Sequence, residues 1–407
     1  MRVLHIQTSM TPAGNAAYRL HLAMRRAGIE SFVMTYKPAV KANYVSSLQG
    51  GWKVLGSKIA TRLLQRTIKR KDFTPNSYSF SIAPILSKGI AQSEQVRSAD
   101  VIYLHWICGS FLSYNDIQEL AKTGKPVFFF MHDMWTFTGG CHHCFDCNQY
   151  ETGCQKCPMF RKKTSVAKKQ GEKKKELFEK YDNFYFISPS QWMAECAKQS
   201  FVLKNKPVYS IPNVVDESIF KPIPKSVARD ILNLPQDKKI ISFGCQATAN
   251  PFKGWLYLQR AINLLDENNI HILVYGSDYD AETAKQLKYS ISFMGKILDE
   301  HVLAIINSAS DVFVSPSLAE SFGLTFLENI LCGTPVVGFD NTAVPEIVMT
   351  DRTGYLARNK DEKDLRNGIL KLLSSPIRPQ LSKPYKSSVL VEIHQDIMTK
   401  ALYQMKK

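Results

Sequence analysis

Short apolar segments that alternate with helix-like segments are the feature that most constrains how this chain can fold. Near the start, VLHIQTS precedes a helical pattern at residues 16–28, and SFVMTY follows it. The apolar runs are short and rich in β-branched and aromatic residues, as are parallel strands buried on both faces. From residue 239 the alternation returns, with strand-like KIISFG and TPVVGFD. The sequence therefore predicts two doubly wound α/β domains in tandem.

Length and composition agree with two domains. The 407 residues exceed one compact core, and 44% hydrophobic with 22% charged residues excludes disordered, collagenous and coiled-coil chains. A proline-bearing stretch at residues 210–226 suggests the linker. We expect an N-terminal domain over 1–212 with a Cys-rich insertion over 141–157, a C-terminal domain over 213–385, and a terminal helix over 386–407.

Targeting signals and charge bear on location. No stretch approaches the ~20 apolar residues of a membrane span, and the first ten residues resemble a strand rather than a secretion signal. We therefore expect a cytoplasmic protein. The net charge is +16, with nine basic residues and three Glu at 161–180, and seven basic and no acidic residues at 53–71. These runs are either solvated helix faces or a patch that contacts an anionic membrane surface.

The segment SPSLAESFGLTFLENILCGTPVVGFD carries the strongest functional signal. Gly323 stands just before a helix that begins near Leu324, and the exposed amides of a helix start favour a diphosphate. Glu320 and Glu328 flank that point. Carboxylates beside a diphosphate would repel it unless they accept hydrogen bonds from neutral hydroxyls, such as those of a ribose and a hexose. The alternative is a helix cap and a surface acid.

The pattern Glu320-x7-Glu328 followed by CGTPVV resembles the retaining family 4 glycosyltransferases (glycosyl transferases group 1), of the bacterial surface-polysaccharide type. IPNVVDESIF, FKGW and RTGYLA also fall where that family has counterparts. The resemblance implies the GT-B fold, with two Rossmann-like domains facing a central cleft and the C-terminal helix packing back on the first domain. It implies transfer of a hexose or related sugar from a UDP- or GDP-sugar to a glycan or lipid-linked glycan acceptor.

The resemblance also assigns residues. It implies catalytic roles for His132, Lys253 and Glu320: His132 faces the donor sugar, Lys253 binds the leaving phosphates and Glu320 binds the sugar. The nucleotide-sugar site that it implies comprises Gly14, Phe322, Gly323, Leu324, Thr325 and Glu328, the last on the ribose. Many members carry an Arg beside the phosphate lysine, but GCQATANPFKGW has neither an Arg nor a second Lys.

The implied chemistry passes through an oxocarbenium-like centre while a diphosphate leaves, so stabilising negative charge is the main task. The family's usual mechanism is a front-face path in which the leaving phosphate takes the acceptor proton. No cofactor is expected for catalysis.

Trp106 and Trp135, near strand ends, either stack on sugar rings or pack in the core. Peripheral attachment to the inner face of the plasma membrane would suit a lipid-linked acceptor.

A cysteine cluster, GGCHHCFDCNQYETGCQKCP, follows His132. C-x2-C pairs have the spacing of tetrahedral zinc sites. A subgroup of these glycosyltransferases is similar here, and the cysteines that match it are Cys141, Cys147, Cys154 and Cys157, with Cys144 extra. These four are the predicted ligands of a structural zinc, and reduced packed thiols are the alternative.

Two rival functions explain part of the sequence. A basic zinc-knuckle protein that binds nucleic acid would account for the charge and the cysteines, but not for Glu320, Glu328 and Lys253. A catalytically inactive GT-B sugar-binding partner would account for the missing Arg. We therefore expect an enzyme, with no nucleic-acid partner.

Overall fold

The computed structural model describes residues 1–9, 15–37, 41–48, 56, 59–60, 62–63, 80–160, 165–245, 251–278, 280–382 and 385–405. The described chain forms two compact units. Unit 1 contains the described residues up to Val214 and the C-terminal segment from Ser388, and unit 2 contains Val215–Ser387. Each boundary lies two residues beyond the expected one (214 against 212, and 387 against 385).

Unit 1 is built on a seven-stranded sheet of order β3-β2-β1-β4-β5-β6-β7, in which all the pairings are parallel. Its strands are β1 (Arg2–Ser9), β2 (Glu30–Lys37), β3 (Val45–Ser47), β4 (Val101–Leu104), β5 (Val127–Phe130), β6 (Phe184–Ser188) and β7 (Val208–Ser210). The central strands β4, β5 and β6 are buried along their whole length, which explains their continuous apolar sequences.

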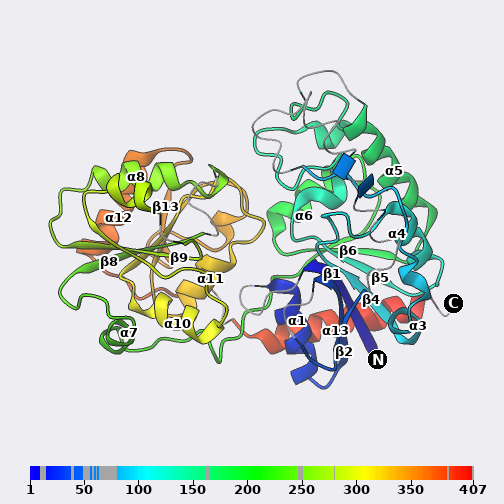
Figure 1. Cartoon of the computed structure of the whole chain (residues 1–407), viewed down its shortest axis with the longest axis horizontal. Coiled ribbons are helices and arrows are strands. Elements are labelled where there is room, and N and C mark those ends of the chain that lie inside the picture. Colours follow the sequence, from blue (N-terminus) through cyan, green and yellow to red (C-terminus); the bar gives the residue numbers. More distant parts are fainter. Residues whose placement is uncertain are drawn as a thin grey trace. The chain divides into compact units, whose positions relative to one another are not determined.

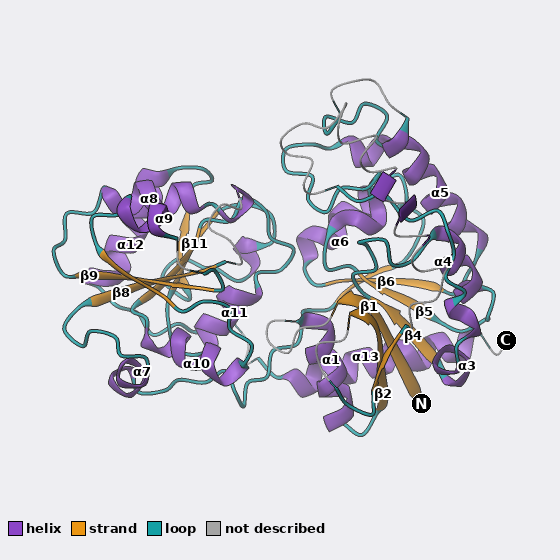
Figure 2. Cartoon of the chain, viewed as in Figure 1, coloured by secondary structure: helices purple, strands orange, loops and turns teal. Residues whose placement is uncertain are grey.

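Helices cover both faces of this sheet (Figures 1 and 2). The helical segments of unit 1 are α1 (Ala16–Arg26), η2 (Ile90–Gln92), α3 (Glu94–Ser98), α4 (Tyr114–Ala121), η3 (Met134–Phe137), η4 (Gln149–Thr152), α5 (Val166–Lys180), α6 (Gln191–Gln199) and α13 (Ser387–Gln404). Helices α3 to α6 share one core with Leu4 and Ile6 of β1. On the opposite face, His394 of α13 contacts Tyr103 of β4, and His21 of α1 contacts His5.

Unit 2 is built on a six-stranded parallel sheet of order β10-β9-β8-β11-β12-β13. Its strands are β8 (Lys239–Gly244), β9 (Ile270–Tyr275), β10 (Ser290–Phe293), β11 (Val312–Ser315), β12 (Val336–Phe339) and β13 (Gly354–Ala357). Its helical segments are α7 (Lys225–Ile231), η5 (Pro251–Lys253), α8 (Trp255–Asn263), α9 (Ala281–Lys285), α10 (Glu300–Ala309), α11 (Leu324–Leu331), η6 (Val344–Glu346) and α12 (Glu362–Ser374). Helices α7, α10 and α11 share one core with the sheet, and α8 and α12 share another. The predicted pair of doubly wound domains is confirmed.

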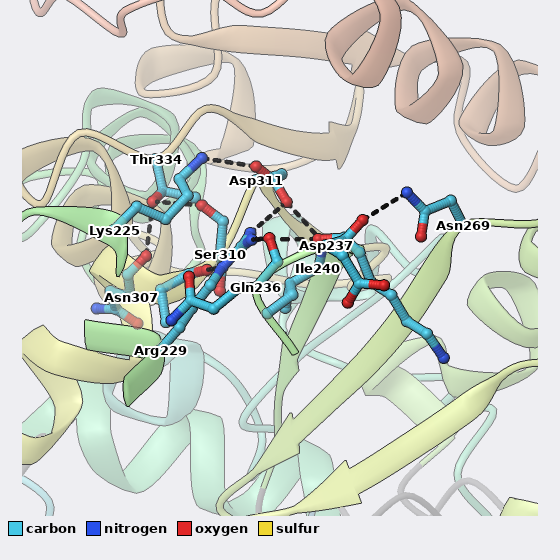
Figure 3. Close-up of polar contacts among 12 residues, drawn as sticks. Lys225, Arg229, Gln236, Asp237, Ile240, Asn269, Asn307, Ser310, Asp311 and Thr334 are labelled. Carbon is cyan, nitrogen blue, oxygen red and sulfur yellow. Dashed lines mark hydrogen bonds and ion pairs between the residues drawn. The ribbon is translucent and has the colours of Figure 1, made fainter. Parts of the chain in front are cut away.

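An ionic network ties together the amino ends of β8 and β11 in unit 2 (Figure 3). Asp311, just before β11, pairs with Lys225 and Arg229 of α7, each at 2.6 Å, and accepts a hydrogen bond from the Ile240 amide at 2.7 Å. Arg229 also donates to the carbonyl oxygens of Ala309, Gln236 and Lys238. These contacts lie at the edge opposite the loops that follow the strands, so they are structural.

The local sequence explains the end of α8 and the packing of α5. Helix α8 ends at Asn263, because Leu264 closes it and the polar, exposed stretch of residues 266–269 follows. The basic run 161–180 includes α5, whose apolar residues pack in the unit 1 core while Lys168 and Lys175 pair with Glu172 and Glu179. Most of the run 53–71 lies outside the described residues. Of the helices described, none is both long and apolar enough to span a bilayer.

Candidate functional site

The carboxyl ends of β8 and β11 bring together the predicted cation and one predicted carboxylate of unit 2. The Nζ atom of Lys253 lies 2.7 Å from Oε1 of Glu320, and the side chains are 27% and 13% exposed. Lys253 ends η5, whereas Glu320 lies in the loop between β11 and α11. Because 67 residues separate them in sequence, only the fold makes them neighbours.

Two hydrogen bonds fix the positions of these loops. The Leu318 amide donates to the Phe252 carbonyl at 2.7 Å, and the Glu320 amide donates to Oγ1 of Thr342 at 3.0 Å. Gly254 has φ +75°, and a Cβ there would lie 1.9 Å from the Pro316 carbonyl oxygen. Only glycine allows the chain to pass this closely, so the position of Lys253 depends on Gly254.

The start of α11 adjoins Glu320. Gly323, with φ +93°, is its N-cap, and Leu324 and Thr325 are its first two residues. The first amides of a helix have no partner within the helix, and the dipole makes this end positive. Phe322 is 9% exposed and anchors the loop in the core. The α11 start thus offers backbone donors to an anion.

Glu328 lies one turn further along α11 and is 3% exposed. The surface-acid alternative is therefore wrong for Glu328, because the residue is buried. Burial, with the Glu328 carboxylate nearby, raises the pKa of Tyr275 well above its ordinary value. Unit 2 thus gathers an ammonium, two carboxylates and a helix start, which can bind a ligand that carries both phosphates and hydroxyls.

The carboxyl edge of the unit 1 sheet carries a second polar group. His142 lies between Asp133 and Ser81, with Nδ1 2.6 Å from Asp133 Oδ2 and Nε2 2.7 Å from Ser81 Oγ. Burial opposes ionisation of Asp133, but His142 and the Trp135 amide outweigh it and lower the Asp133 pKa. Trp106 is 37% exposed, and its ring centroid lies 5.8 Å from that of His142.

His132 is the second residue after β5 and precedes Asp133 of this group. Its Nε2 lies 2.8 Å from Nδ1 of His105, and its ring stacks on Phe130 at 4.7 Å between centroids. Burial lowers its pKa to about 4, although Asp133 acts in the opposite direction, so His132 is neutral at pH 7. Trp135, in contrast, is 4% exposed and packs under Lys174, so the packing interpretation holds for Trp135.

The cysteine cluster lies in the long segment between β5 and α5. The Cys141 thiol is within hydrogen-bonding reach of Cys144 and Cys157, and the Gly139 amide donates to Cys154 Sγ at 3.2 Å. Burial raises the Cys154 pKa to about 11. All nine cysteines are free thiols. Within the described ranges no three His, Cys, Asp or Glu side chains form a group that could hold a metal ion.

The structure therefore brings together Lys253, Glu320, residues 322–325 and Glu328 in unit 2 and places His132 in unit 1. Gly14 and residues 246–250, where the Arg is missing, lie outside the described residues. The sequence patterns did not point to His105 or to the Asp133–His142–Ser81 group. The signal for His105 was present, since it is the second-to-last residue of the strand-like segment DVIYLHW, just as His132 is of KPVFFFMHD.

Comparison with known proteins adds family evidence for unit 2. Residues 238–375 match the family model described as glycosyl transferases group 1. The chain is 31% identical over 189 residues to D-inositol 3-phosphate glycosyltransferase of Stackebrandtia nassauensis, covering 42% of each chain. It is 36% identical over 88 residues to a GDP-mannose-dependent phosphatidylinositol dimannoside mannosyltransferase of Mycobacterium tuberculosis, covering 22% of this chain and 23% of that one. The match thus spans about two fifths or less of the length of these curated relatives.

Solved structures match over the whole chain. Sucrose-phosphate synthase from Thermosynechococcus elongatus aligns with a TM-score of 0.61 and 18% identity, covering 100% of this chain and 97% of that one. Anabaena HepE, solved in complex with UDP-glucose, aligns with a TM-score of 0.60 and 16% identity over the same shares. At these identities the likeness establishes the fold. The chain has the GT-B fold, and its residues 238–375 resemble the glycosyl transferases group 1.

Proposed function

We propose that this protein is a retaining glycosyltransferase that moves a hexose or related sugar from a nucleotide sugar to a glycan or lipid-linked glycan acceptor. The observation that carries the proposal is the contact between Lys253 and Glu320 at the start of α11, with Glu328 buried one turn further on. The match of residues 238–375 to the glycosyl transferases group 1 supports it.

The proposed mechanism assigns each group a task. The Lys253 ammonium and the α11 amides stabilise the charge that develops on the departing diphosphate. Glu320 orients Lys253 and accepts hydrogen bonds from sugar hydroxyls, and Glu328 accepts them from the ribose. His132 contacts the donor sugar, as the family resemblance implies. The leaving phosphate takes the acceptor proton on the front face, which retains the anomeric configuration.

Other features support the proposed acceptor side and the location. Trp106 offers a partly exposed indole next to the Asp133–His142 pair, an arrangement that suits a sugar ring. The net charge of +16 supports a role at the inner face of the plasma membrane, in the assembly of a cell-surface polysaccharide. Binding to vesicles with and without anionic lipid tests this part separately.

Thermal unfolding with UDP, GDP, ADP and CMP, each at millimolar concentration, tests the donor site. A nucleotide at ~100 times its dissociation constant should stabilise the protein by about 2.7 kcal/mol. We expect one of them to raise the midpoint and Glu328→Gln to abolish that rise. Glu267→Gln is the matched control, because Glu267 is exposed at the opposite edge of unit 2.

A second variant separates phosphate from ribose recognition. Lys253→Met should weaken binding of the nucleoside diphosphate and leave the corresponding monophosphate less affected, because Lys253 is assigned to the leaving phosphates. Stabilisation by DNA with no response to any nucleotide would instead favour the nucleic-acid-binding alternative. Nucleotide binding without transfer or hydrolysis of the matching nucleotide sugar would favour an inactive sugar-binding partner.

Structural zinc is a separate proposal that rests on the spacing of the cysteines. Protein purified without chelators should contain one zinc per chain by elemental analysis. Cys157→Ser should lose it, whereas Cys144→Ser and Cys108→Ser, outside the predicted set, should keep it. Metal-free wild-type protein with nine titratable thiols would instead support reduced, packed cysteines.

A further inference from the structure

Three histidines form a continuous hydrogen-bonded chain across the unit 1 sheet. His5 lies on β1, His105 follows β4 and His132 follows β5, and these three strands are adjacent in the sheet. Nδ1 of His5 is 2.9 Å from Nε2 of His105, and Nδ1 of His105 is 2.8 Å from Nε2 of His132. The rings are nearly parallel, with interplanar angles of 17° and 18°.

The inner end of this chain is deeply buried. His5 is 0% and His105 is 5% exposed, and Tyr103 stacks on His5 at 5.2 Å between centroids. Burial lowers the pKa of both histidines well below the ordinary value, and it lowers that of His132 to about 4. All three imidazoles are therefore neutral at pH 7, and each carries one N–H.

Two neutral imidazoles can share a hydrogen bond only if one donates and the other accepts. For this chain that leaves two arrangements. In the first, all the protons are on Nδ1: His5 donates to His105, and His105 donates to His132. In the second, all the protons are on Nε2: His132 donates to His105, and His105 donates to His5.

The buried end of the chain decides between these arrangements. Nε2 of His5 has no hydrogen-bond partner among the described residues. The second arrangement would place an N–H on this buried atom with no acceptor, whereas the first leaves only a lone pair there. Buried N–H groups without partners are rarer than acceptors without partners. The first arrangement is therefore favoured, and Nε2 of His132 is an acceptor.

We propose that His105 is a positioning residue that fixes His132 in the Nδ1–H tautomer, with His5 satisfying the inner nitrogen of His105. His132 then offers a ligand an N–H donor at Nδ1, and its Nε2 is not available as a base toward the acceptor. The identity of the ligand atom, a sugar-hydroxyl oxygen, rests on the proposed function. The assignment of the His132 tautomer does not depend on that function.

Long-range 1H–15N NMR on protein labelled at its nine histidines tests the tautomer directly. Protonated and unprotonated ring nitrogens resonate far apart, and His132→Asn identifies the signals of His132. We expect Nδ1–H for His5, His105 and His132 in the wild type, although neutral imidazole in water prefers Nε2–H. A wild-type His132 that carries its proton on Nε2, or that exchanges between both, overturns the proposal.

Variants test whether His105 is what fixes the tautomer of His132. His105→Phe should return His132 to the Nε2–H form, and His105→Asn, whose amide N–H replaces Nδ1–H, should retain Nδ1–H. His5→Phe should also retain it, because the inner nitrogen of His105 then becomes the buried end. His394→Phe is the matched control, a buried histidine of the same layer that bonds Tyr103 rather than the chain. Loss of the Nδ1–H form in His394→Phe would show a general packing effect and overturn the assignment to His105.

Kinetic measurements test whether the tautomer of His132 affects turnover of a nucleotide sugar. If a nucleotide sugar binds, His105→Phe should lower kcat for its transfer or hydrolysis about tenfold, leave the nucleotide-induced stabilisation unchanged, and be rescued by His105→Asn. An Nδ1–H form of His132 in a protein that binds no nucleotide would support the tautomer assignment and refute the proposed function. An unchanged kcat in His105→Phe, despite an altered tautomer, would refute the role toward the sugar.

Discussion

Unit 1 buries a group of neutral histidines, whereas the main polar networks of unit 2 are ionic. Unit 1 relies on neutral imidazoles: His5, His21, His105, His132 and His394 all have pKa values lowered by burial. Unit 2 relies on ions: Asp311 pairs with Lys225 and Arg229, and Lys253 pairs with Glu320. The two arrangements respond to different perturbations.

The difference follows from where the groups lie. The unit 1 histidines lie between aromatic rings on a sheet face that α1 and α13 cover, where a charge would be costly to desolvate. Asp311 lies at a sheet edge, where two cations and a backbone amide approach one carboxylate. Burial would raise the Asp311 pKa, but Lys225, the Ile240 amide and Arg229 lower it below its ordinary value. A neutral network is thus sensitive to pH near 6.5, and an ionic one only near 4.

The largest expected effect is acid unfolding of unit 1 before unit 2. Each buried histidine has a folded pKa below 6.5, so the unfolded state binds more protons as the pH falls below 6.5 and stability is lost. The loss is about 1.4 kcal/mol per histidine per pH unit, or roughly 7 kcal/mol per pH unit for five, against a total of about 5–15 kcal/mol for a domain. In unit 2, burial lowers the pKa of His271.

Hydrogen exchange by mass spectrometry between pH 7 and pH 4.5 measures the loss of stability of each unit as the pH falls. Peptides of β4 and β5 should lose protection first, while those of β8 and β11 remain protected. His394→Phe should lower by one the number of protons that unit 1 takes up when it unfolds in acid, because the pKa of His394 is about 3 in the folded protein. Simultaneous loss of protection in both units would contradict the comparison.

Sequence patterns predicted the fold well because both sheets are parallel and buried on both faces. Such strands are short continuous apolar runs, and VFFF and VFVS are buried at every position. The start of α11 was also predictable, since Gly323 precedes a periodic apolar segment. These features are local in sequence.

The remainder was not predictable because it depends on contacts between distant residues. His5 and His105 are 100 residues apart, and Lys253 and Glu320 are 67 apart. The zinc prediction rests on cysteine spacing alone and stays a prediction, because the positions of the thiols depend on how the whole β5–α5 segment packs. The role of Asp311 could not be seen either, because its partners come from α7 and from the amino end of β8.

A smaller expected effect tests the ionic half of the comparison. Arg229→Met leaves the Asp311 carboxylate, 16% exposed, without its buried cation, and should cost unit 2 about 3–5 kcal/mol. Lys225→Met removes the other cation, whose side chain is 45% exposed, and should cost at most about 1 kcal/mol. Urea unfolding, with hydrogen exchange of β8 and β11 peptides to assign the transition to unit 2, measures both losses.

The difference between these variants should shrink as the pH falls below about 4, because the folded Asp311 pKa lies below that of the unfolded chain and protonation removes the charge that Arg229 neutralises. Equal losses in the two variants would mean that hydrogen bonds from Arg229 to carbonyl oxygens, and its burial, contribute nothing beyond the charge.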